Sequence, residues 1–560
     1  MPDQTLPLIV QSDRTLLLEV HGEHYVHARD DIAPFAELVK SPEHIHSYIV
    51  SPLSLWNAAA MGMGADEVIA RMMKWSKYPV PDSMITFIRD FCARYGSVKL
   101  LAGDTPGTLK LTCTDERIFQ ELTHHTHLKK IMQVSGDRTF TLALLERGTV
   151  KVHLIKLGYP VEDLVPLREG APLSFSLRKT AISGRPFSLR NYQREAMEAF
   201  LGSHPRTLGL GYGTVVMPCG SGKTVIAIAA IHALQTETLV ISTNTAAVHQ
   251  WIDELLDKTT LSEEDIGEYT GGKKEIRPVT VCTYQVLTWR SDKLSDFPHF
   301  SLFTKKRWGL IVYDEVHLLP APVFRITAEI QATRRLGMTA TLVREDKRED
   351  EVFSLIGPKR YDVPWKELEQ KGWIASAVCT EIRIPLPEKL ELSYAVAPKR
   401  QKFRIASENP LKIRVAQEII ENSPEDQILV IGQYISQLHR IAEALHAPII
   451  TGSLANSKRE ELYRQFKAGE IKLLVVSKVA NFAIDLPDAS LAIQISGTFG
   501  SRQEEAQRLG RILRPKERNA RFYNIVTRYS TEEDFAANRQ RFLAEQGYTY
   551  HLEVWDELAP

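Results

Sequence analysis

Short apolar runs, each followed by a polar loop, recur along the last two thirds of the chain. They begin at Thr214, Leu239, Val279 and Leu310 and, after residue 410, at Ile428, Pro448, Leu473, Leu491 and Phe522. Most of the first group lead through the loop into a segment whose apolar residues have helical spacing. Buried strands that alternate with helices are typical of a doubly wound parallel sheet. We therefore expect an α/β fold with two lobes in tandem, over residues 183–375 and 376–560.

The first 180 residues have a different pattern. Residues 15–20 have the composition of a short buried strand. Apolar side chains three and four positions apart predict three amphipathic helices in this part of the chain. These helices cover residues 54–63, 66–78 and 83–95. From residue 131, short apolar runs alternate with turns that contain Gly and Pro. The pattern predicts an α+β accessory or interaction domain over residues 1–130 and a small α+β module with a linker over residues 131–182.

Length and charge narrow the class of protein. At about 150 residues per domain, 560 residues suggest three to four domains. Lys and Arg together number 69 and are balanced by 69 Asp and Glu, while apolar residues make up 44% of the chain. These values exclude wholesale disorder and a general polycation. They still permit a nucleic-acid partner, because a large protein can hold a basic groove within a neutral total charge.

Cysteine usage and the N-terminus indicate the compartment. The chain has five cysteines and no CxxC pair, which excludes a disulfide scaffold and argues against zinc fingers and short-spaced iron–sulfur clusters. The N-terminus lacks the basic stretch and long apolar core of a signal peptide, and no apolar run approaches the length of a membrane span. We expect a cytoplasmic protein that does not cross a membrane.

A phosphate-binding loop follows the strand that begins at Thr214. The segment 218–224 reads Pro-Cys-Gly-Ser-Gly-Lys-Thr and precedes an apolar helical stretch. Small residues let backbone N–H groups converge on phosphate oxygens at the positive end of a helix dipole. We expect Gly220, Ser221, Gly222, Lys223 and Thr224 to bind ATP. In this pattern the lysine reaches the β- and γ-phosphates and the threonine hydroxyl binds Mg²⁺. The chain departs from the strict pattern at Met217, where Gly is usual.

Two adjacent carboxylates follow the apolar run that begins at Leu310. The sequence there reads Asp314-Glu315-Val-His317. Asp314 suits Mg²⁺ binding through water, and Glu315 suits the role of general base toward the attacking water. Coupled with the phosphate loop upstream, this pair predicts hydrolysis of a nucleoside triphosphate.

Further segments appear in the order typical of superfamily 2 helicases. Arg190-Asn-Tyr-Gln193 stands before the phosphate loop, where that superfamily reads adenine. The remaining segments are Thr243 to Trp251, Thr283-Tyr-Gln, Gly337-Met-Thr339-Ala-Thr341, the stretch 477–487 with Asp485, and the stretch from Gln507 to Arg514. The chain resembles the XPB family of this superfamily, and most of all its bacterial members. The resemblance is carried by 218–224, 314–317, Arg344-Glu345-Asp346, 482–487 and 500–514. The resemblance rests on many motifs over about 185–530. Over the first 180 residues it rests on the general character of the sequence and not on catalytic residues.

The resemblance implies two RecA-like lobes with ATP bound between them, and a damage-recognition-like module before the motor. It assigns the adenine contact to the Arg190–Gln193 segment, and to Asp485 either a ribose contact or coordination of the closing of the lobes. Coupling of nucleotide state to DNA is assigned to His317, Thr339 and Thr341. It places Thr283, Arg344, Glu345 and Asp346 at the DNA, together with Lys399, Arg400 and Lys402 of a thumb-like insertion near 388–410. Arg511 and Arg514 share a helix face and, with Gln507, are expected to act on the γ-phosphate from the second lobe.

Three functions remain open. The first is an ATP-dependent DNA helicase of 3′ to 5′ polarity, implied by the resemblance, in DNA repair. The second is a double-stranded DNA translocase or remodeller, and the third is an ATP-switched scaffold for a nuclease or transcription partner. Residues 1–180 are the expected partner surface, and a cytoplasmic, nucleoid-associated location in a bacterium is expected. Trp251 and Tyr284 are interpreted as core residues rather than as platforms for stacked bases.

Overall fold

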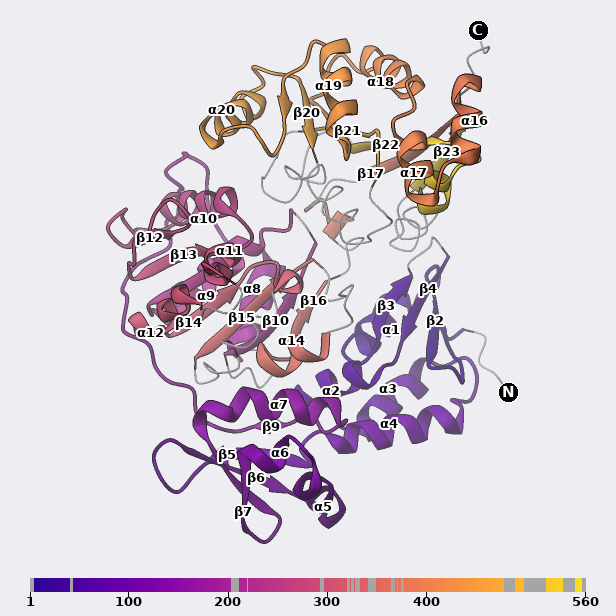
Figure 1. Ribbon diagram of the computed structural model, residues 1–560. Helices are drawn as coiled ribbons and strands as arrows, with labels where there is room; N and C mark the ends of the chain where they lie inside the picture. Colours follow the sequence, from indigo (N-terminus) through magenta and orange to yellow (C-terminus); the bar gives the residue numbers. More distant parts are fainter. Residues whose placement is uncertain are drawn as a thin grey trace. The chain divides into compact units, whose positions relative to one another are not determined.

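The computed structural model divides into two compact units. The first comprises Met1–Val39, Glu43–Met217 and Gly222–Asp362, and the second comprises Lys40–Pro42, Pro218–Ser221 and Val363–Pro560. The residues that the structure describes are 5–40, 44–202, 211–218, 220–292, 297–319, 323, 327, 333–340, 349–363, 368–369, 371–373, 377–477, 489–497, 520–536 and 549–555. Figure 1 shows the chain coloured along the sequence.

A four-stranded sheet with its helices opens the chain. The strands are β1 (Leu8–Val10), β2 (Thr15–Glu19), β3 (Glu37–Lys40) and β4 (Ile45–Ile49), in the order β1-β2-β4-β3. The helices are α1 (Tyr25–Ile32), α2 (Pro52–Ala60), α3 (Ala65–Trp75) and α4 (Asp82–Arg94). The expected strand and the three expected amphipathic helices are therefore present. Their apolar faces share one core, which includes Leu18, Leu55, Met72 and Ile88.

A five-stranded sheet follows, in the order β7-β8-β6-β5-β9. Its strands are β5 (Val98–Ala102), β6 (Thr108–Cys113), β7 (Met132–Gly136), β8 (Thr139–Ala143) and β9 (Glu162–Asp163). Its helices are α5 (Glu116–His124), α6 (Leu128–Ile131) and α7 (Arg147–Lys156), the last preceded by the short 3₁₀ turn η1 (Leu144–Glu146). The sheet takes strands from both sides of residue 130, at which the sequence pattern changes.

The first lobe is a seven-stranded sheet in the order β12-β13-β11-β14-β15-β10-β16. All its neighbouring strands run parallel. The strands are β10 (Tyr212–Val216), β11 (Thr238–Ser242), β12 (Ile266–Tyr269), β13 (Val279–Thr283), β14 (Leu310–Tyr313), β15 (Arg334–Thr339) and β16 (Lys359–Asp362). Its helices and 3₁₀ turns are α8 (Asn191–Leu201), α9 (Lys223–Leu234), α10 (Thr245–Lys258), α11 (Tyr284–Thr288), η2 (Pro298–Ser301), α12 (Leu302–Lys305), η3 (Val316–Leu318) and α14 (Glu349–Leu355). The central strands β11, β13 and β14 are buried along their whole length, as expected for a sheet covered on both faces.

Polar and apolar contacts join the N-terminal part to the first lobe. The backbone N–H of Lys359 donates to Oδ1 of Asn57 at 2.7 Å, which links α2 to β16. Helix α7 packs on α14, where Lys156 and Glu351 form an ion pair at 3.1 Å. Trp56, Ile155 and Phe353 form a small apolar cluster at the same junction. The N-terminal domains are therefore packed against the edge of the first lobe and belong to the same compact unit.

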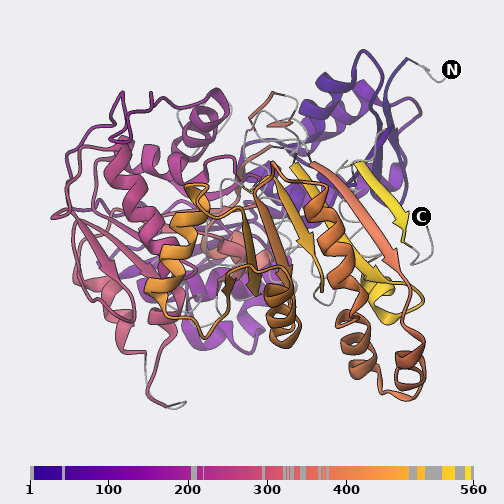
Figure 2. The same cartoon turned by 90° about the horizontal axis from the view of Figure 1, so that it is seen from above.

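The second lobe repeats the parallel architecture, with strand order β19-β20-β18-β21-β22-β17-β23. Its strands are β17 (Ala377–Ile384), β18 (Ile428–Gly432), β19 (Ile449–Ile450), β20 (Leu473–Ser477), β21 (Leu491–Gln494), β22 (Ala520–Thr527) and β23 (Thr549–Val554). Its helices are α16 (Glu388–Val396), α17 (Lys399–Ser407), α18 (Leu411–Glu421), α19 (Ile435–Ala444) and α20 (Asn456–Lys467). Figure 2 shows these strands side by side, with helices flanking them. The expected α/β fold with two tandem RecA-like lobes is confirmed, and α16 and α17 occupy the stretch of the expected insertion.

Candidate ATP site in the first lobe

The phosphate loop connects the end of β10 to the start of α9. Gly220 and Gly222 have φ values of 78° and 82°, in the left-handed region that disfavours residues with a Cβ. A Cβ at position 222 would also lie 2.5 Å from Nε2 of Gln193. The loop closes on itself, because Oγ of Ser221 donates to the carbonyl of Pro218 at 2.7 Å. Helix α9 begins at the end of this loop, and the helix dipole is positive there, so this end suits phosphate.

Lys223 and Thr224 are the first two residues of α9. The Lys223 side chain is 11% exposed, and its Nζ donates to the carbonyl of Met217 at 3.4 Å. The same Nζ lies 3.8 Å from Oε1 of Glu315. The structure therefore brings the predicted phosphate lysine beside the predicted general base.

Asp314 follows the buried strand β14 and takes part in four hydrogen bonds with residues that the structure describes. Its backbone N–H donates to the carbonyl of Ile241 at 2.9 Å, and its own carbonyl accepts from the Tyr284 hydroxyl at 3.0 Å. Its Oδ2 accepts from Oγ of Ser242 and from Nε1 of Trp251, both at 3.0 Å. Burial and the neighbouring Glu315 raise the pKa of Asp314, while the donors on Oδ2 and the Lys223 charge act in the opposite direction.

Glu315 lies in the left-handed region of the backbone, with a φ of 47°. This conformation is unfavourable for a residue with a side chain, and such strain is concentrated at functional sites. Within the described part of the chain, its Oε2 is buried and accepts no hydrogen bond. The Nδ1 atom of His317 lies 3.4 Å from that oxygen. The carboxylate therefore lies close to both Lys223 and His317.

Two of the three predicted coupling residues meet behind this carboxylate. Nδ1 of His317 shares a hydrogen bond of 2.7 Å with Oγ1 of Thr339, the last residue of β15. The carbonyl of Thr339 accepts from the backbone N–H of Met217 at 2.9 Å. Thr339 therefore links the strand that enters the phosphate loop to the segment that carries the carboxylates. Thr341 lies outside the described residues.

The predicted adenine segment begins α8. Oε1 of Gln193 accepts from the backbone N–H of Arg190 at 3.0 Å, and Nη1 of Arg190 donates to the Tyr192 hydroxyl at 3.1 Å. Gln193 is 4% exposed, and its amide group is the one that lies against Gly222. The structure thus places the Arg190–Gln193 segment next to the phosphate loop.

The predicted DNA-contact residues are only partly described. Thr283 is buried, and its Oγ1 caps α11 by accepting from the backbone N–H of Val286 at 3.2 Å. Nζ of Lys402 in α17 lies 5.5 Å from the centre of the Tyr394 ring. The side chains of Lys399 and Arg400 are outside the described part. The other predicted site residues that lie outside it are Arg344, Glu345, Asp346, Asp485, Gln507, Arg511 and Arg514.

Three residues around Asp314 were not predicted to belong to the site. Trp251 and Tyr284 were expected to be core residues, and they are buried, with 2% and 4% exposure. Each also donates to Asp314, as does Ser242. Burial and the charge of Asp314 raise the pKa of Tyr284 well above its ordinary value, so the hydroxyl keeps its proton to donate. Their positions along the sequence could have indicated this role. Ser242 ends β11, Trp251 lies in the helix that follows β11, and Tyr284 directly follows β13.

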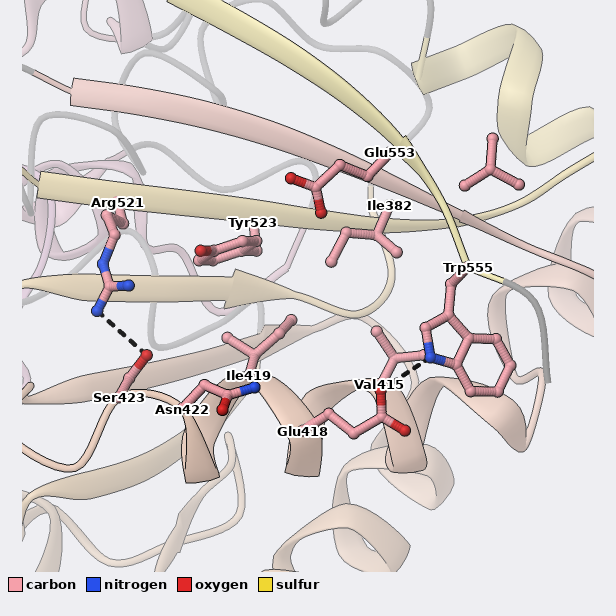
Figure 3. A pocket seen from close by; sticks show the side chains of 11 residues that line it. Ile382, Val415, Glu418, Ile419, Asn422, Ser423, Arg521, Tyr523, Glu553 and Trp555 are labelled. Atoms are coloured by element: carbon pink, nitrogen blue, oxygen red, sulfur yellow. Dashed lines mark hydrogen bonds between the residues drawn. The ribbon is translucent and has the colours of Figure 1, made fainter. Parts of the chain in front are cut away.

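A separate pocket of about 240 Å³ lies in the second lobe, between α18 and the strands at one edge of the sheet (Figure 3). Nε1 of Trp555 donates to Oε2 of Glu418 at 2.8 Å across one end, and Arg521 donates to Oγ of Ser423 at 3.1 Å at the other. None of the predicted site residues line it. In the described parts of the chain, no group of three or more His, Cys, Asp or Glu is arranged around a metal, and no helix has the length and apolarity to span a membrane.

Comparison with known proteins assigns recognised domains to most of the chain. Residues 368–556 match the ERCC3/RAD25/XPB C-terminal helicase, residues 186–344 match the type III restriction enzyme res subunit, and residues 8–135 match a helicase conserved C-terminal domain. The chain is 48% identical to the DNA 3′-5′ helicase XPB of Kineococcus radiotolerans, over 99% of this chain and 97% of that protein. It is also 48% identical to the protein of that name from Mycobacterium tuberculosis, over 99% and 98%. The general transcription and DNA repair factor IIH helicase/translocase subunit XPB of Enterocytozoon bieneusi is 30% identical over 97% and 92%.

Proposed function

The chain belongs to the XPB family of superfamily 2 helicases, and we propose that it is an ATP-dependent DNA 3′-5′ helicase whose first lobe hydrolyses ATP through Lys223, Thr224, Asp314 and Glu315. The observation that carries this assignment is the arrangement of Lys223 and His317 around the Glu315 carboxylate, at 3.8 and 3.4 Å. The three residues lie in the segments that follow β10 and β14, and ligands of parallel α/β sheets bind beyond the carboxyl ends of the strands.

The donor set fits Mg²⁺. This ion is usually held by one or two protein oxygens together with substrate phosphates and water, rather than by a cage of several carboxylates. In the described part of the chain, both side-chain donors to Asp314 bind Oδ2, which leaves Oδ1 for a metal-bound water. The Thr224 hydroxyl is the second oxygen. When bound, the ion neutralises charge on the β- and γ-phosphates.

We propose a hydrolysis step that uses these side chains. The loop N–H groups and Lys223 hold the phosphates in line with the attacking water. Glu315 accepts a proton from that water as its oxygen attacks the γ-phosphorus. The bond from phosphorus to the bridging oxygen of ADP breaks, so ADP and inorganic phosphate leave. We propose, from the resemblance, that Gln507, Arg511 and Arg514 act on the same phosphate from the second lobe. We also propose that Asp485 either contacts the ribose or coordinates the closing of the lobes.

Two substitutions test the ATP site. Lys223→Ala removes the phosphate cation, so we expect loss of ATP binding. Glu315→Gln keeps the shape but cannot take the proton, so we expect ATP binding with turnover reduced at least a hundredfold. The matched control is Glu195→Gln, because that carboxylate accepts from the Tyr361 hydroxyl at 2.8 Å in the same lobe and outside the proposed ATP site. Ordinary ATPase activity in Lys223→Ala or in Glu315→Gln would refute the assignment.

Strand displacement decides between the helicase and the translocase functions. Duplexes with a 3′ tail, a 5′ tail or no tail are incubated with ATP, with Lys223→Ala as the inactive control. Unwinding of the 3′-tailed duplex alone supports the proposed polarity. ATPase stimulated by duplex DNA without any unwinding favours a double-stranded DNA translocase or remodeller.

The remaining assignments concern DNA and protein partners. We propose that DNA at a single-strand/duplex junction is contacted by Thr283 and by Lys399, Arg400 and Lys402 of the thumb-like insertion, and that Arg344-Glu345-Asp346 separate the strands. Residues 1–180 are the proposed surface for a nuclease or a repair or transcription protein. Their packing on the first lobe through Asn57 and Lys156 supports this, because a partner bound there would be fixed to the motor. We propose that the protein acts in DNA repair, in the cytoplasm at the bacterial nucleoid.

A further inference from the structure

Both segments that the resemblance assigns to the DNA backbone also contact Asp314. The first runs from Thr243 to Trp251, and Nε1 of Trp251 donates to Oδ2 of Asp314 at 3.0 Å. The second begins at Thr283, and the hydroxyl of the next residue, Tyr284, donates to the Asp314 carbonyl at 3.0 Å. One carboxylate residue is therefore held, at its side chain and at its backbone, by the segments that follow β11 and β13, two strands on the same side of β14.

The strand order explains this convergence. Strand β14, which ends one residue before Asp314, pairs with β11, and β11 pairs with β13 on its other side. Helix α10 begins shortly after β11 and α11 begins directly after β13. Asn244 caps α10 by accepting from the backbone N–H of Ala247 at 3.0 Å, and Thr283 caps α11. Each capped helix carries its donor as part of a rigid element, so a displacement of the helix displaces the donor.

The two donors lie too deep to touch DNA themselves. Trp251 is 2% exposed and Tyr284 is 4% exposed. A buried indole N–H needs an acceptor, but a backbone carbonyl would satisfy it, as the carbonyl of Leu302 does for Trp308 at 2.9 Å. Trp251 donates instead to the carboxylate that we assign to Mg²⁺. Burial alone therefore explains the need for a partner and does not explain the choice of Asp314.

We propose that Trp251 and Tyr284 are positioning residues through which DNA bound to their segments sets the orientation of Asp314 and so the rate of ATP hydrolysis. This rests on the proposed function, since it needs DNA at those segments and Mg²⁺ at Asp314. Hydrogen bonds of 3.0 Å are lost when donor and acceptor separate beyond about 3.5 Å, so a helix shift of about half an ångström is enough to release the carboxylate. Catalytic groups need positions held to about that tolerance.

The test compares Trp251→Phe and Tyr284→Phe with two matched controls in the same lobe. Trp308→Phe also deletes a buried indole N–H···O bond, and Tyr361→Phe deletes a hydroxyl that donates to Glu195. ATPase kcat and KM are measured with and without a 3′-tailed duplex, together with the Mg²⁺ concentration for half-maximal rate and the melting temperature. A purely structural role would lower the melting temperature and leave the ratio of DNA-stimulated to basal kcat unchanged.

We expect Trp251→Phe to lower the DNA-stimulated kcat about tenfold, the effect of one lost hydrogen bond to a charged group. The KM for ATP should stay within about twofold, and half-maximal rate should require more Mg²⁺. Tyr284→Phe should change the same quantities in the same direction, and both controls should keep the wild-type stimulation ratio. If Trp251→Phe does not fold, Tyr284→Phe decides.

Two results overturn different claims. The first is that DNA stimulates the ATPase activity of Trp251→Phe and Tyr284→Phe as strongly as that of Trp308→Phe and Tyr361→Phe. That result refutes the positioning role while the proposed ATP site stands. If the wild-type protein shows no stimulation by any DNA, or if Lys223→Ala retains ATPase activity, the proposed function itself fails.

Discussion

Replacing Asp163 with Asn should destabilise the N-terminal part of the protein more than any exposed substitution in the same module. Nε and Nη2 of Arg147 donate to the two carboxylate oxygens of Asp163 at 3.0 and 2.8 Å, and Nζ of Lys151 donates to Oδ2 at 3.0 Å. The three side chains are 1%, 5% and 6% exposed for Arg147, Asp163 and Lys151. The substitution keeps the shape of the side chain and removes the negative charge that two buried cations share.

The surroundings make this charge hard to replace. Arg335 and Arg360, which the first lobe contributes to the same junction, are also buried, and both guanidinium groups lie within 5.6 Å of the Tyr212 ring centre. Nζ of Lys151 lies 5.9 Å from that ring centre. Asp163→Asn therefore leaves Arg147 and Lys151 buried beside further cations. Breaking a buried ion pair by removing one partner costs about 3–5 kcal/mol.

The pKa of Asp163 gives a second route to the size of the stability loss in Asp163→Asn. Burial by itself would raise it, but the charges of Lys151 and Arg147 outweigh burial and hold it at about 2, against an ordinary value of 3.8. That difference corresponds to about 2.5 kcal/mol of stability. Because the folded pKa is depressed, this stability is present above about pH 4 and is lost as the pH falls toward 2. Both routes give a loss of a few kcal/mol.

The assay is urea unfolding of the full chain at neutral pH, combined with hydrogen exchange of peptides from α7 and β9. The matched control is Asp104→Asn, which breaks the exposed pair between Asp104 and Lys110, whose nearest atoms lie 2.7 Å apart in the same module. We expect a clear fall in the unfolding midpoint and faster exchange for Asp163→Asn, with no measurable change for the control. The variant should also lose the extra acid sensitivity between pH 4 and 2. Equal unfolding midpoints for the two variants would refute the reasoning.

Two further predictions concern the phosphate loop and the second lobe. Gly222→Ala should abolish ATP binding or reduce it at least tenfold, because φ is 82° there and the new Cβ would lie 2.5 Å from Nε2 of Gln193. Nucleotide titration measures this loss, and wild-type affinity for ATP would contradict the prediction. Lys412→Met should cost about 3–5 kcal/mol, because Nζ of Lys412 donates to both carboxylate oxygens of Glu532 at 2.6 and 2.8 Å and both residues are buried. Glu461→Gln, on the exposed face of α20, is its control in urea unfolding, and equal midpoints would contradict the prediction.

Much of the fold and of the ATP site could be predicted from local sequence. Runs such as Leu310–Tyr313 are apolar throughout because both faces of the sheet are covered, and that requirement is visible in the sequence itself. The phosphate loop is equally local, since the glycines, the lysine and the start of α9 stand within a few residues of one another. Residues 131–182 carried no sequence signal for chemistry, and the Arg147–Asp163 pair in them was not foreseen.

The sequence by itself thus determined the two parallel α/β lobes, the phosphate loop and the carboxylates at the end of a strand, because each depends on neighbours along the chain. Only the tertiary structure decided which side chains hold Asp314. Its donors Ser242, Trp251 and Tyr284 stand 72, 63 and 30 residues before it. They converge because β11 pairs with both β13 and β14, and strand order depends on how the whole sheet packs. Apolar periodicity is the same for every strand order, so it does not predict which strand ends lie side by side.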